Sequence, residues 1–270
     1  MPELPEVETV VQGLAPHLVG QQVAMVDLRR DGLRRPFPAD LRQRLTGARI
    51  LSLSRRAKYG LISSDRGTLI FHLGMSGRWR IDAQIAEKHD HLRLLTSAGT
   101  WLALNDARRF GSVDWLEADG GGDFAPFAAL GPEPLGPDFT ADYLVAALRA
   151  RAAPIKNLLL DQSIVAGLGN IYVCEALHIA HISPLTRGAD VPRKNITPLV
   201  AAIRQVLADA IAAGGSTIRD HRQVTGELGY FSHSWRVYGR ANQPCPACAA
   251  PILRHVQSGR SSFYCAKCQK

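Results

Sequence analysis

Two cysteine pairs near the C-terminus constrain the fold of this 270-residue chain more than any other feature. Cys245 and Cys248 form the first pair, Cys265 and Cys268 form the second, and sixteen residues separate them. This spacing is typical of a zinc ribbon, in which each pair holds the ion from a tight turn and the intervening chain forms a hairpin. Because sulfur would fill all four positions, we expect one closed, structural Zn²⁺ site per chain.

The cellular setting supports metal binding over disulfides. The chain has no apolar stretch long enough to span a membrane, and its N-terminus lacks the basic and then apolar segments of a signal peptide. We therefore expect a cytoplasmic protein, in which disulfides are disfavoured. Four unrelated thiols or a redox dithiol are the alternatives, and Cys174 is expected to be a core thiol.

The charge of the chain favours a nucleic-acid partner. It carries 32 Lys and Arg against 24 Asp and Glu, a net charge of +8, and its pI is near 9.5. Arginine dominates, which suits the recognition of phosphates and base edges. Charge alone does not separate such proteins from ribosomal or membrane-surface proteins.

The pattern along the chain changes from strands to helices. Apolar spacing predicts a helix over 5–18 that ends or bends at Pro16. Short β-type runs separated by turns fill 21–116 and indicate an antiparallel sandwich or barrel. A Gly- and Pro-rich loop and linker then precede helical patterns. We expect an N-terminal β-sandwich domain, a linker, a helical domain and a zinc finger, at residues 1–130, 131–139, 140–235 and 236–270.

A glycine-rich turn in the helical part suggests an anion site. The segment 161–172 contains Gly-Leu-Gly-Asn without the third glycine of a dinucleotide loop or the Lys of a P-loop. We expect a helix, a turn and a second helix with Asn170 as its cap. Free N–H groups at that helix start could bind a phosphate, although an ordinary capped turn would have the same sequence.

The N-terminus MPELPEVET permits two interpretations from its residues alone. Proline and glutamates suit the first turn of a helix. Alternatively, Met1 is removed, so that Pro2 presents a free secondary amine beside the carboxylates of Glu3 and Glu6.

Motifs along nearly the whole chain are similar to those of the bacterial formamidopyrimidine-DNA glycosylase family. They are PELPEVET, RRAKY (55–59), HLGMSG (72–77), KHDH (88–91), NDARRFG (105–111), LGPEPL (130–135), GLGNIY (167–172), GGSTIRD (214–220), GYF (229–231), YGR (238–240) and FYCAKCQK. The resemblance implies an α+β fold with an N-terminal helix on an antiparallel β-sandwich, a helical domain with a helix–two-turn–helix, and a C-terminal zinc finger.

The resemblance also implies roles for individual residues. Pro2 matches the nucleophile, Glu3 the general acid or base, and Glu6 a carboxylate that organises the site. Lys58 matches a lysine that reaches the reacting nucleotide. Met75, Arg108 and Phe110 match side chains that fill the void left by a flipped base. Arg260 matches a finger-tip arginine that is counted with the catalytic group. The residues that match DNA contacts are His89, His91, Arg109, Asn170 and Arg219. Arg219 lies in the segment 217–231, which is expected to include the loop that covers the flipped base.

The implied function is base-excision repair. We expect a bifunctional glycosylase that removes 8-oxoguanine opposite cytosine and formamidopyrimidines, and that cleaves the strand by β,δ-elimination through a Schiff base. Its partner would be double-stranded DNA with oxidised bases or abasic sites, bound by a monomer at the bacterial nucleoid, with no membrane. Leu4 disfavours the pyrimidine-directed endonuclease VIII branch, which stays an alternative, as does a protein that only binds DNA.

Overall fold

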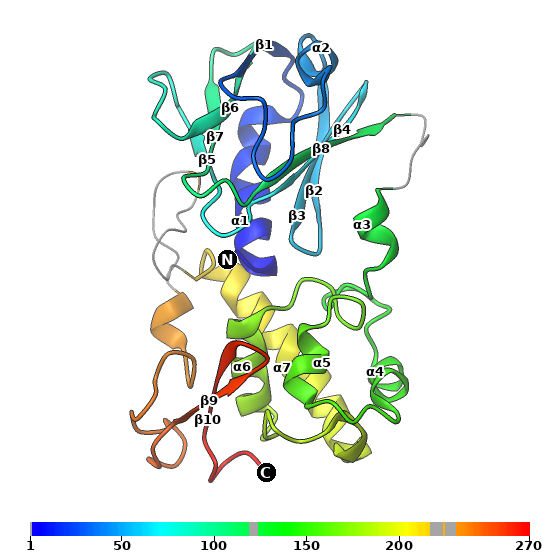
Figure 1. Ribbon diagram of the computed structural model, residues 1–270, viewed down its shortest axis with the longest axis vertical. Coiled ribbons are helices and arrows are strands. Elements are labelled where there is room, and N and C mark those ends of the chain that lie inside the picture. The colour runs from blue at the N-terminus through cyan, green and yellow to red at the C-terminus, as the bar shows by residue number, and fades with distance from the viewer. Residues whose placement is uncertain (1, 119–123, 217–223, 225–230) are drawn as a thin grey trace. The chain divides into compact units, whose positions relative to one another are not determined.

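The computed structural model describes residues 2–118, 124–216, 224 and 231–270 (Figure 1). The chain divides into two compact units. The first consists of Met1–Ala128 and Ala213–Ser232, and the second of Ala129–Ala212 and His233–Lys270. No helix within the described ranges is both long and apolar enough to cross a membrane.

Helix α1 (Leu4–Leu18) opens the first unit and contributes to its core. Its apolar side chains recur at helical spacing, and Val7, Val10 and Leu14 are fully buried. Pro16 does not end the helix, as the sequence analysis had allowed, because the helix continues through Pro16 to Leu18. A proline this close to the C-terminus removes only one hydrogen bond of the helix.

Two antiparallel four-stranded sheets form the body of the first unit, as expected of a β-sandwich. One has the order β1-β6-β7-β5 and the other β2-β3-β4-β8. Their strands are β1 (Val23–Leu28), β2 (Ile50–Arg56), β3 (Tyr59–Ser64), β4 (Gly67–His72), β5 (Arg78–Ile81), β6 (Asp90–Thr96), β7 (Trp101–Asn105) and β8 (Ser112–Glu117). Two short helices, α2 (Leu41–Leu45) and α3 (Ala125–Ala128), lie in segments where the sequence predicts no helix.

One apolar core joins α1 to both sheets. It includes Leu14 of α1, Leu69 and Phe71 of β4, and Trp79 of β5. Val224 belongs to the same core, and its carbonyl accepts a hydrogen bond from the N–H of Ile81. Helix α1 also packs on β2 and β3, so the N-terminus and the β2–β3 turn lie at the same end of the unit (Figure 1).

Helices dominate the second unit, as the sequence predicts. Helix α6 packs on both α5 and α7, and α4 packs on α7. The four helices are α4 (Ala141–Leu148), α5 (Ile155–Leu160), α6 (Asn170–Ile179) and α7 (Arg193–Ala212). There are also two 3₁₀ turns, η1 (Gly188–Asp190) and η2 (Phe231–Ser234), and the boundary between the two units falls within η2.

A β-hairpin of β9 (Leu253–Gln257) and β10 (Arg260–Tyr264) completes the second unit. Its loop is Ser258–Gly259, and both residues have positive φ, 46° and 74°. Such two-residue turns match the twist of paired strands, and glycine tolerates the left-handed backbone. The hairpin expected between the cysteine pairs is confirmed.

Candidate functional site

The N-terminus of α1 gathers two buried carboxylates beside Pro2. Pro2 is buried, and Glu3 and Glu6 are 4% and 2% exposed. Glu3 is the N-cap, and its side chain accepts the N–H of Glu6 while Glu6 Oε2 accepts the N–H of Glu3 at 2.8 Å. This capping box fixes the peptide unit that follows Pro2 and places a carboxylate at each end of the first helical turn.

Glu6 also holds a turn that is distant in sequence. Its Oε1 accepts the N–H of Ser216 at 2.8 Å. Gly214 and Gly215 precede that residue with φ of 76° and 82°, a conformation in which glycine is favoured. The sequence analysis assigned no role to this turn, although the Gly-Gly-Ser within GGSTIRD was a signal for it.

Lys58 lies in the two-residue turn between β2 and β3. Ala57 precedes it in a left-handed conformation with φ of 52°. Although a hairpin turn is normally exposed, Lys58 is only 8% exposed. The structure therefore places an ammonium group in a largely desolvated position at the end of the unit where α1 begins (Figure 1).

His72, at the end of β4, is a candidate that the sequence analysis missed. Burial, followed by the positive charges of Lys58, Arg34 and Arg35, lowers its pKa to about 4. Its Nδ1 accepts the N–H of Gly74 at 3.0 Å, so the ring is neutral with its proton on Nε2. The only indication of this neutral donor in the sequence is that His72 is the first residue of the HLGMSG motif.

The three residues expected to fill a void in DNA lie on two loops of the first unit. Met75 is 41% exposed in the β4–β5 loop, and Phe110 is 45% exposed in the β7–β8 loop. The guanidinium of Arg108 stacks on the Phe110 ring at 4.7 Å from its centroid. Two large apolar side chains are thus exposed to solvent on the loops that also carry Arg108. Side chains of the hydrophobic core would be buried, so this exposure instead suits insertion between bases.

The expected phosphate contacts His89 and His91 are neighbours, with ring centroids 6.3 Å apart. His91 is 3% exposed, and its Nε2 donates to the carbonyl of Asp106 at 2.9 Å. Burial lowers its pKa. Arg109, the other contact expected in this unit, is exposed and has a left-handed φ of 57°.

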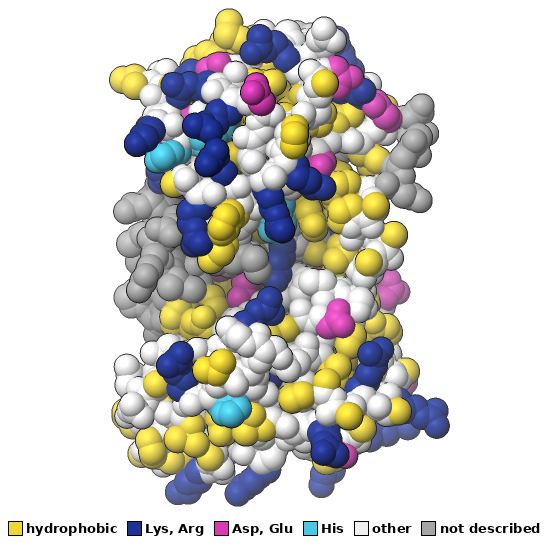
Figure 2. Space-filling view, in the orientation of Figure 1, with side chains coloured by type: hydrophobic (Ala, Val, Ile, Leu, Met, Phe, Trp, Pro, Cys, Tyr) yellow, Lys and Arg dark blue, Asp and Glu magenta, His cyan; other side chains and the backbone are white. Residues whose placement is uncertain are grey.

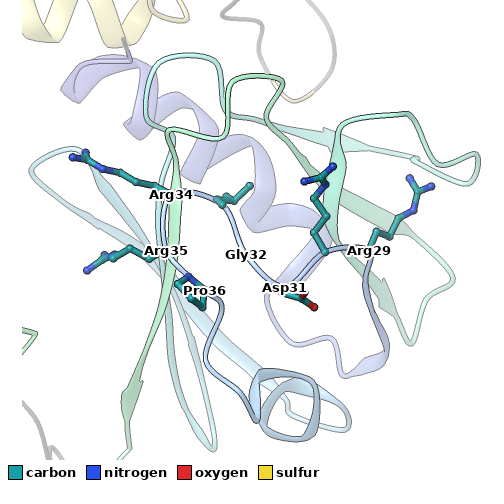
Figure 3. A pocket seen from close by; sticks show the side chains of 8 residues that line it. Arg29, Asp31, Gly32, Arg34, Arg35 and Pro36 are labelled. Carbon is teal, nitrogen blue, oxygen red and sulfur yellow. The ribbon is translucent and has the colours of Figure 1, made fainter.

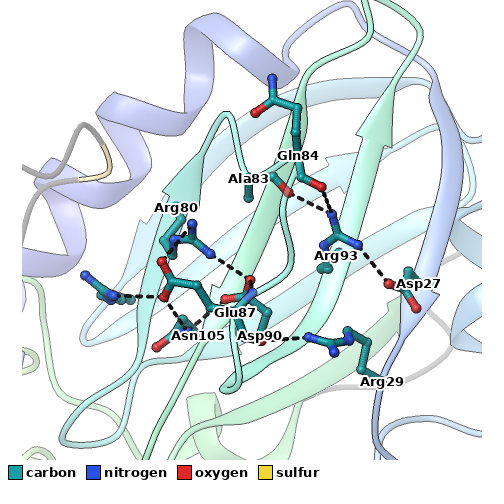
Figure 4. A network of polar contacts seen from close by, with 10 residues as sticks. Asp27, Arg29, Arg80, Ala83, Gln84, Glu87, Asp90, Arg93 and Asn105 are labelled. Carbon is teal, nitrogen blue, oxygen red and sulfur yellow. Dashed lines mark hydrogen bonds and ion pairs between the residues drawn. The ribbon is translucent and has the colours of Figure 1, made fainter.

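An ion-pair network supports the segment that carries His89 (Figure 4). Buried Asp90 accepts hydrogen bonds from Arg80 at 2.7 Å and Asn105 at 2.8 Å. Glu87 pairs with Arg80 at 2.9 Å, and its carbonyl accepts a bond from Arg29 at 2.7 Å. The network ties the 82–89 loop to β5 and β7 and so fixes where His89 emerges.

A basic loop, 29–36, lines an open pocket of about 570 Å³ in the first unit (Figure 3). Four of its residues are arginines, and Arg34 and Arg35 point to the opposite side from Arg29. Arg35 pairs with Asp114 at 2.8 Å, and the N–H of Arg34 donates to the carbonyl of Gly111. Lys and Arg side chains are spread widely over the face in Figure 2, with fewer acidic ones among them.

In the second unit, Asn170 is the first residue of α6, and the expectation that it caps this helix is wrong. Gly169 is the N-cap, and Asn170 Nδ2 instead donates to the carbonyl of Ser261 at 2.9 Å. Its buried Oδ1 has no hydrogen-bond partner in the described part of the chain. The ammonium of Lys156, fully buried in α5, reaches the same carbonyl at 3.0 Å and Ser262 Oγ at 2.7 Å.

Arg260 begins β10 and is exposed next to the hairpin turn. Because Lys156 and Asn170 both bind the carbonyl of Ser261, the backbone that carries Arg260 is held on α5 and α6. Nothing in the sequence linked these two helices to the hairpin tip. Arg219 and most of the expected base-covering loop at 217–231 lie outside the described residues.

The four cysteines of the predicted zinc site come together, and their sulfurs lie within 4.8 Å of one another. Cys245 Sγ lies 3.9 Å from Cys268 Sγ, and Cys248 Sγ lies 3.4 Å from Cys265 Sγ. Tetrahedral Zn–S bonds of about 2.3 Å require S–S separations of about 3.8 Å, so the cluster fits a zinc ion. No other His, Cys, Asp or Glu cluster suited to a metal occurs among the described residues.

His178, on α6, supports the cysteine cluster from outside. It is 4% exposed, and its Nε2 lies 3.4 Å from Cys245 Sγ. A zinc-bound thiolate only accepts hydrogen bonds, so Nε2 is the donor. Burial lowers the pKa of His178 to about 4, aided by the charges of Arg236, His181 and Arg240.

Three family models match consecutive parts of the chain. They are the formamidopyrimidine-DNA glycosylase N-terminal domain over residues 1–113, the formamidopyrimidine-DNA glycosylase H2TH domain over 130–222, and a zinc finger found in FPG and IleRS over 242–270. The α+β architecture, the helix–two-turn–helix and the single structural zinc site of the sequence analysis are confirmed.

Curated relatives and solved structures agree along the full length. Formamidopyrimidine-DNA glycosylases of Rhizorhabdus wittichii and Sphingopyxis alaskensis are each 60% identical, with all of both chains covered. MutM (FPG) of Thermus thermophilus is 37% identical with a TM-score of 0.88, covering 99% of this chain and 98% of that one. A Lactococcus lactis FPG variant, solved with DNA containing Fapy-dG, is 34% identical with a TM-score of 0.92, and both chains are fully covered.

Proposed function

Because the chain belongs to the formamidopyrimidine-DNA glycosylase family, we propose that it excises oxidised purines from double-stranded DNA and cleaves the strand at the resulting abasic site. It is a DNA glycosylase of base-excision repair with one structural zinc ion. Similar proteins have been solved with DNA containing Fapy-dG, an abasic site or carbocyclic 8-oxo-G. This range supports oxidised purines and abasic sites as the substrates.

The capping box at the N-terminus carries the mechanistic part of the proposal. After removal of Met1, Pro2 would present a secondary amine next to buried Glu3. An α-amine has a reference pKa near 8 against about 10.4 for lysine, so it is the more available nucleophile at neutral pH. Its nitrogen attacks C1′ of the damaged nucleotide, and the base leaves with the electrons of the glycosidic bond and takes up a proton.

Strand cleavage follows from the Schiff base that results. The Pro2 nitrogen gives up its proton, the C1′–O4′ bond breaks and O4′ takes up a proton. The product is an iminium between the Pro2 nitrogen and C1′, which acidifies the C2′ hydrogens. Removal of one of these expels the 3′ phosphate, and a second elimination expels the 5′ phosphate. Glu3 would exchange protons with the sugar, Lys58 would stabilise the phosphate, and Glu6 would hold the turn at Ser216 and the peptide after Pro2 in place.

The remaining residues would hold the distorted duplex. Met75, Arg108 and Phe110 would enter the stack where the target base leaves it, with the guanidinium facing the orphan cytosine. His89, His91 and Arg109 in the first unit, and Asn170 and Arg260 in the second, would bind phosphates, with Arg219 in the covering loop. The zinc ion supplies a cross-link that holds the finger together, and the protein's own residues provide the chemistry.

A borohydride trap on untagged protein tests the proposal. We expect a covalent adduct with a duplex containing 8-oxoguanine opposite cytosine, and mass spectrometry should place the bond on Pro2. A protein with an uncleavable extension before Pro2 is the matched control, because its proline nitrogen is an amide. It should still bind the duplex but form no adduct.

Two other results would each support a different function. An adduct only with oxidised pyrimidines would indicate activity like that of the endonuclease VIII branch. Tight binding of damaged duplex without any adduct, from protein shown to have lost Met1, would indicate a protein that only binds DNA. The expected monomer and its location at the nucleoid are parts of the same proposal, which sedimentation and imaging would test.

A further inference from the structure

We propose that Asp106 and Ser76 form a positioning pair that joins the β4–β5 and β7–β8 loops into one rigid body, so that Met75, Arg108 and Phe110 approach DNA as a preformed wedge. The inference rests on the proposed function, since it assumes that these three side chains fill the void. It adds two residues that would act through the wedge without touching the reacting nucleotide.

The carboxylate of Asp106 is the centre of the joint. It is fully buried, and its Oδ1 accepts hydrogen bonds from Ser76 Oγ at 2.5 Å and from the N–H of Arg108 at 3.3 Å. Oδ2 accepts the N–H of Gly111 at 2.8 Å. A buried carboxylate is costly unless it is satisfied, and these donors compensate for its burial. Since both oxygens are bonded, Asp106 has no accessible atom for acid–base catalysis.

Ser76 connects this centre to the loop that carries Met75. Its Oγ donates to Asp106 and also accepts the N–H of Arg108 at 3.2 Å. A single hydroxyl therefore bonds to both the carboxylate and the backbone of the other loop. Shared hydrogen bonds of this kind reinforce one another, so loss of either partner weakens the whole joint.

The backbones of the two loops are also in direct contact. Gly74 has φ of 59°, and a Cβ at this position would lie 2.3 Å from the carbonyl carbon of Phe110. A Cβ on Gly111 would lie 2.7 Å from the carbonyl oxygen of His72. These approaches are possible only for glycine, so both loops have backbones shaped to fit each other.

Polar bonding explains how exposed side chains can be held without a core around them. Met75 and Phe110 are about half exposed, so burial of these two side chains does not fix the loop positions that carry them. The Asp106 network fixes their backbones instead and leaves the side chains available. A wedge ordered before binding avoids the entropic cost of ordering at the moment of contact. Because its guanidinium is held in one place, it cannot shift to suit a different opposite base, and this increases discrimination between opposite bases.

The test compares Asp106→Asn, Ser76→Ala and the double variant. Asparagine would place an NH2 group against a backbone N–H, and alanine would remove the bridging hydroxyl. We expect each single variant to lower the ratio of kcat/KM for 8-oxoguanine opposite cytosine over that opposite adenine by about tenfold, which is a free energy of about 1.4 kcal/mol. Because both bonds belong to one joint, the double variant should lose no more than Asp106→Asn alone.

Two controls separate this inference from the proposed function and from simple unfolding. Borohydride trapping on a single-stranded abasic oligonucleotide needs Pro2 but leaves no void to fill, so it should match wild type in every variant. Asp27→Asn breaks an ion pair with Arg93 at 3.1 Å, away from both loops, and should leave the ratio unchanged (Figure 4). If Asp106→Asn does not fold, Ser76→Ala carries the test.

The inference is overturned if folded Ser76→Ala and Asp106→Asn keep the discrimination ratio within twofold of wild type. It is also overturned if the losses of the two single variants add fully in the double variant. Failure of wild type to trap the single-stranded oligonucleotide would instead count against the proposed function.

Discussion

Substitution of Glu175 should open the zinc finger before the rest of the second unit unfolds. Glu175 lies on α6 and is 1% exposed. Its Oε1 accepts the N–H groups of Val237 at 3.0 Å and Tyr238 at 2.8 Å, and its Oε2 accepts that of Arg236 at 2.8 Å. One carboxylate thus holds the chain that leads to the first cysteine pair.

The magnitude follows from counting these donors. A backbone N–H left without an acceptor in a buried site costs about 1–3 kcal/mol. Glu175→Ala removes the acceptor of all three, and some of them will regain water, so we expect a loss of about 4 kcal/mol. In Glu175→Gln the amide oxygen can keep the two bonds of Oε1 while its NH2 faces the N–H of Arg236, for a loss of about 2 kcal/mol.

Zinc release during urea titration, followed with a coloured chelator, measures this opening directly. Circular dichroism on the same samples reports unfolding of the helices. Asp209→Ala on α7 is the control, because it removes an exposed carboxylate from the same unit and should change stability by less than about 0.5 kcal/mol. A change below about 1 kcal/mol for Glu175→Ala, or equal effects of Ala and Gln, would refute the reasoning.

Three further predictions concern single side chains. The pKa of His72 is about 4 in the folded protein against 6.5 normally, so the unfolded chain binds a proton first, and stability should fall by about 3 kcal/mol as pH drops from 6.5 to 4. Urea titrations at pH 7 and pH 5 measure this fall in the free energy of unfolding, and it should be smaller in His72→Gln than in wild type. An equal fall in both proteins would contradict the prediction. His178→Phe removes the donor to Cys245 and should speed zinc release to a chelator about tenfold, whereas His178→Gln should restore part of the difference. Gly74→Ala places a Cβ against the Phe110 backbone and should weaken binding to damaged duplex more than to undamaged duplex, as fluorescence anisotropy can measure; equal weakening would argue against a role in the wedge.

Features that depend on short segments were predictable from the sequence. The zinc ligands follow from cysteine spacing, because each pair is held by a local turn and the hairpin between them needs only the tip at Ser258–Gly259. The strands of the first unit and the main helices of the second follow from apolar periodicity and turn residues. Errors occurred where a local rule competed with context, as when Asn170 bonded to Ser261 and left the cap of α6 to Gly169.

The sequence by itself determined the family and the metal site, and it predicted which residues the chemistry would require. Only the tertiary structure decided which side chains are fixed in position and which partners fix them. Glu6 reaches Ser216 across 210 positions, and Lys156 reaches the hairpin across more than 100. The pKa of His72 falls to about 4 only because the fold buries the ring near Lys58 and two arginines. Such contacts join segments whose separation in the chain carries no periodic signal, so they are fixed by the packing of whole sheets and helices and not by local propensity.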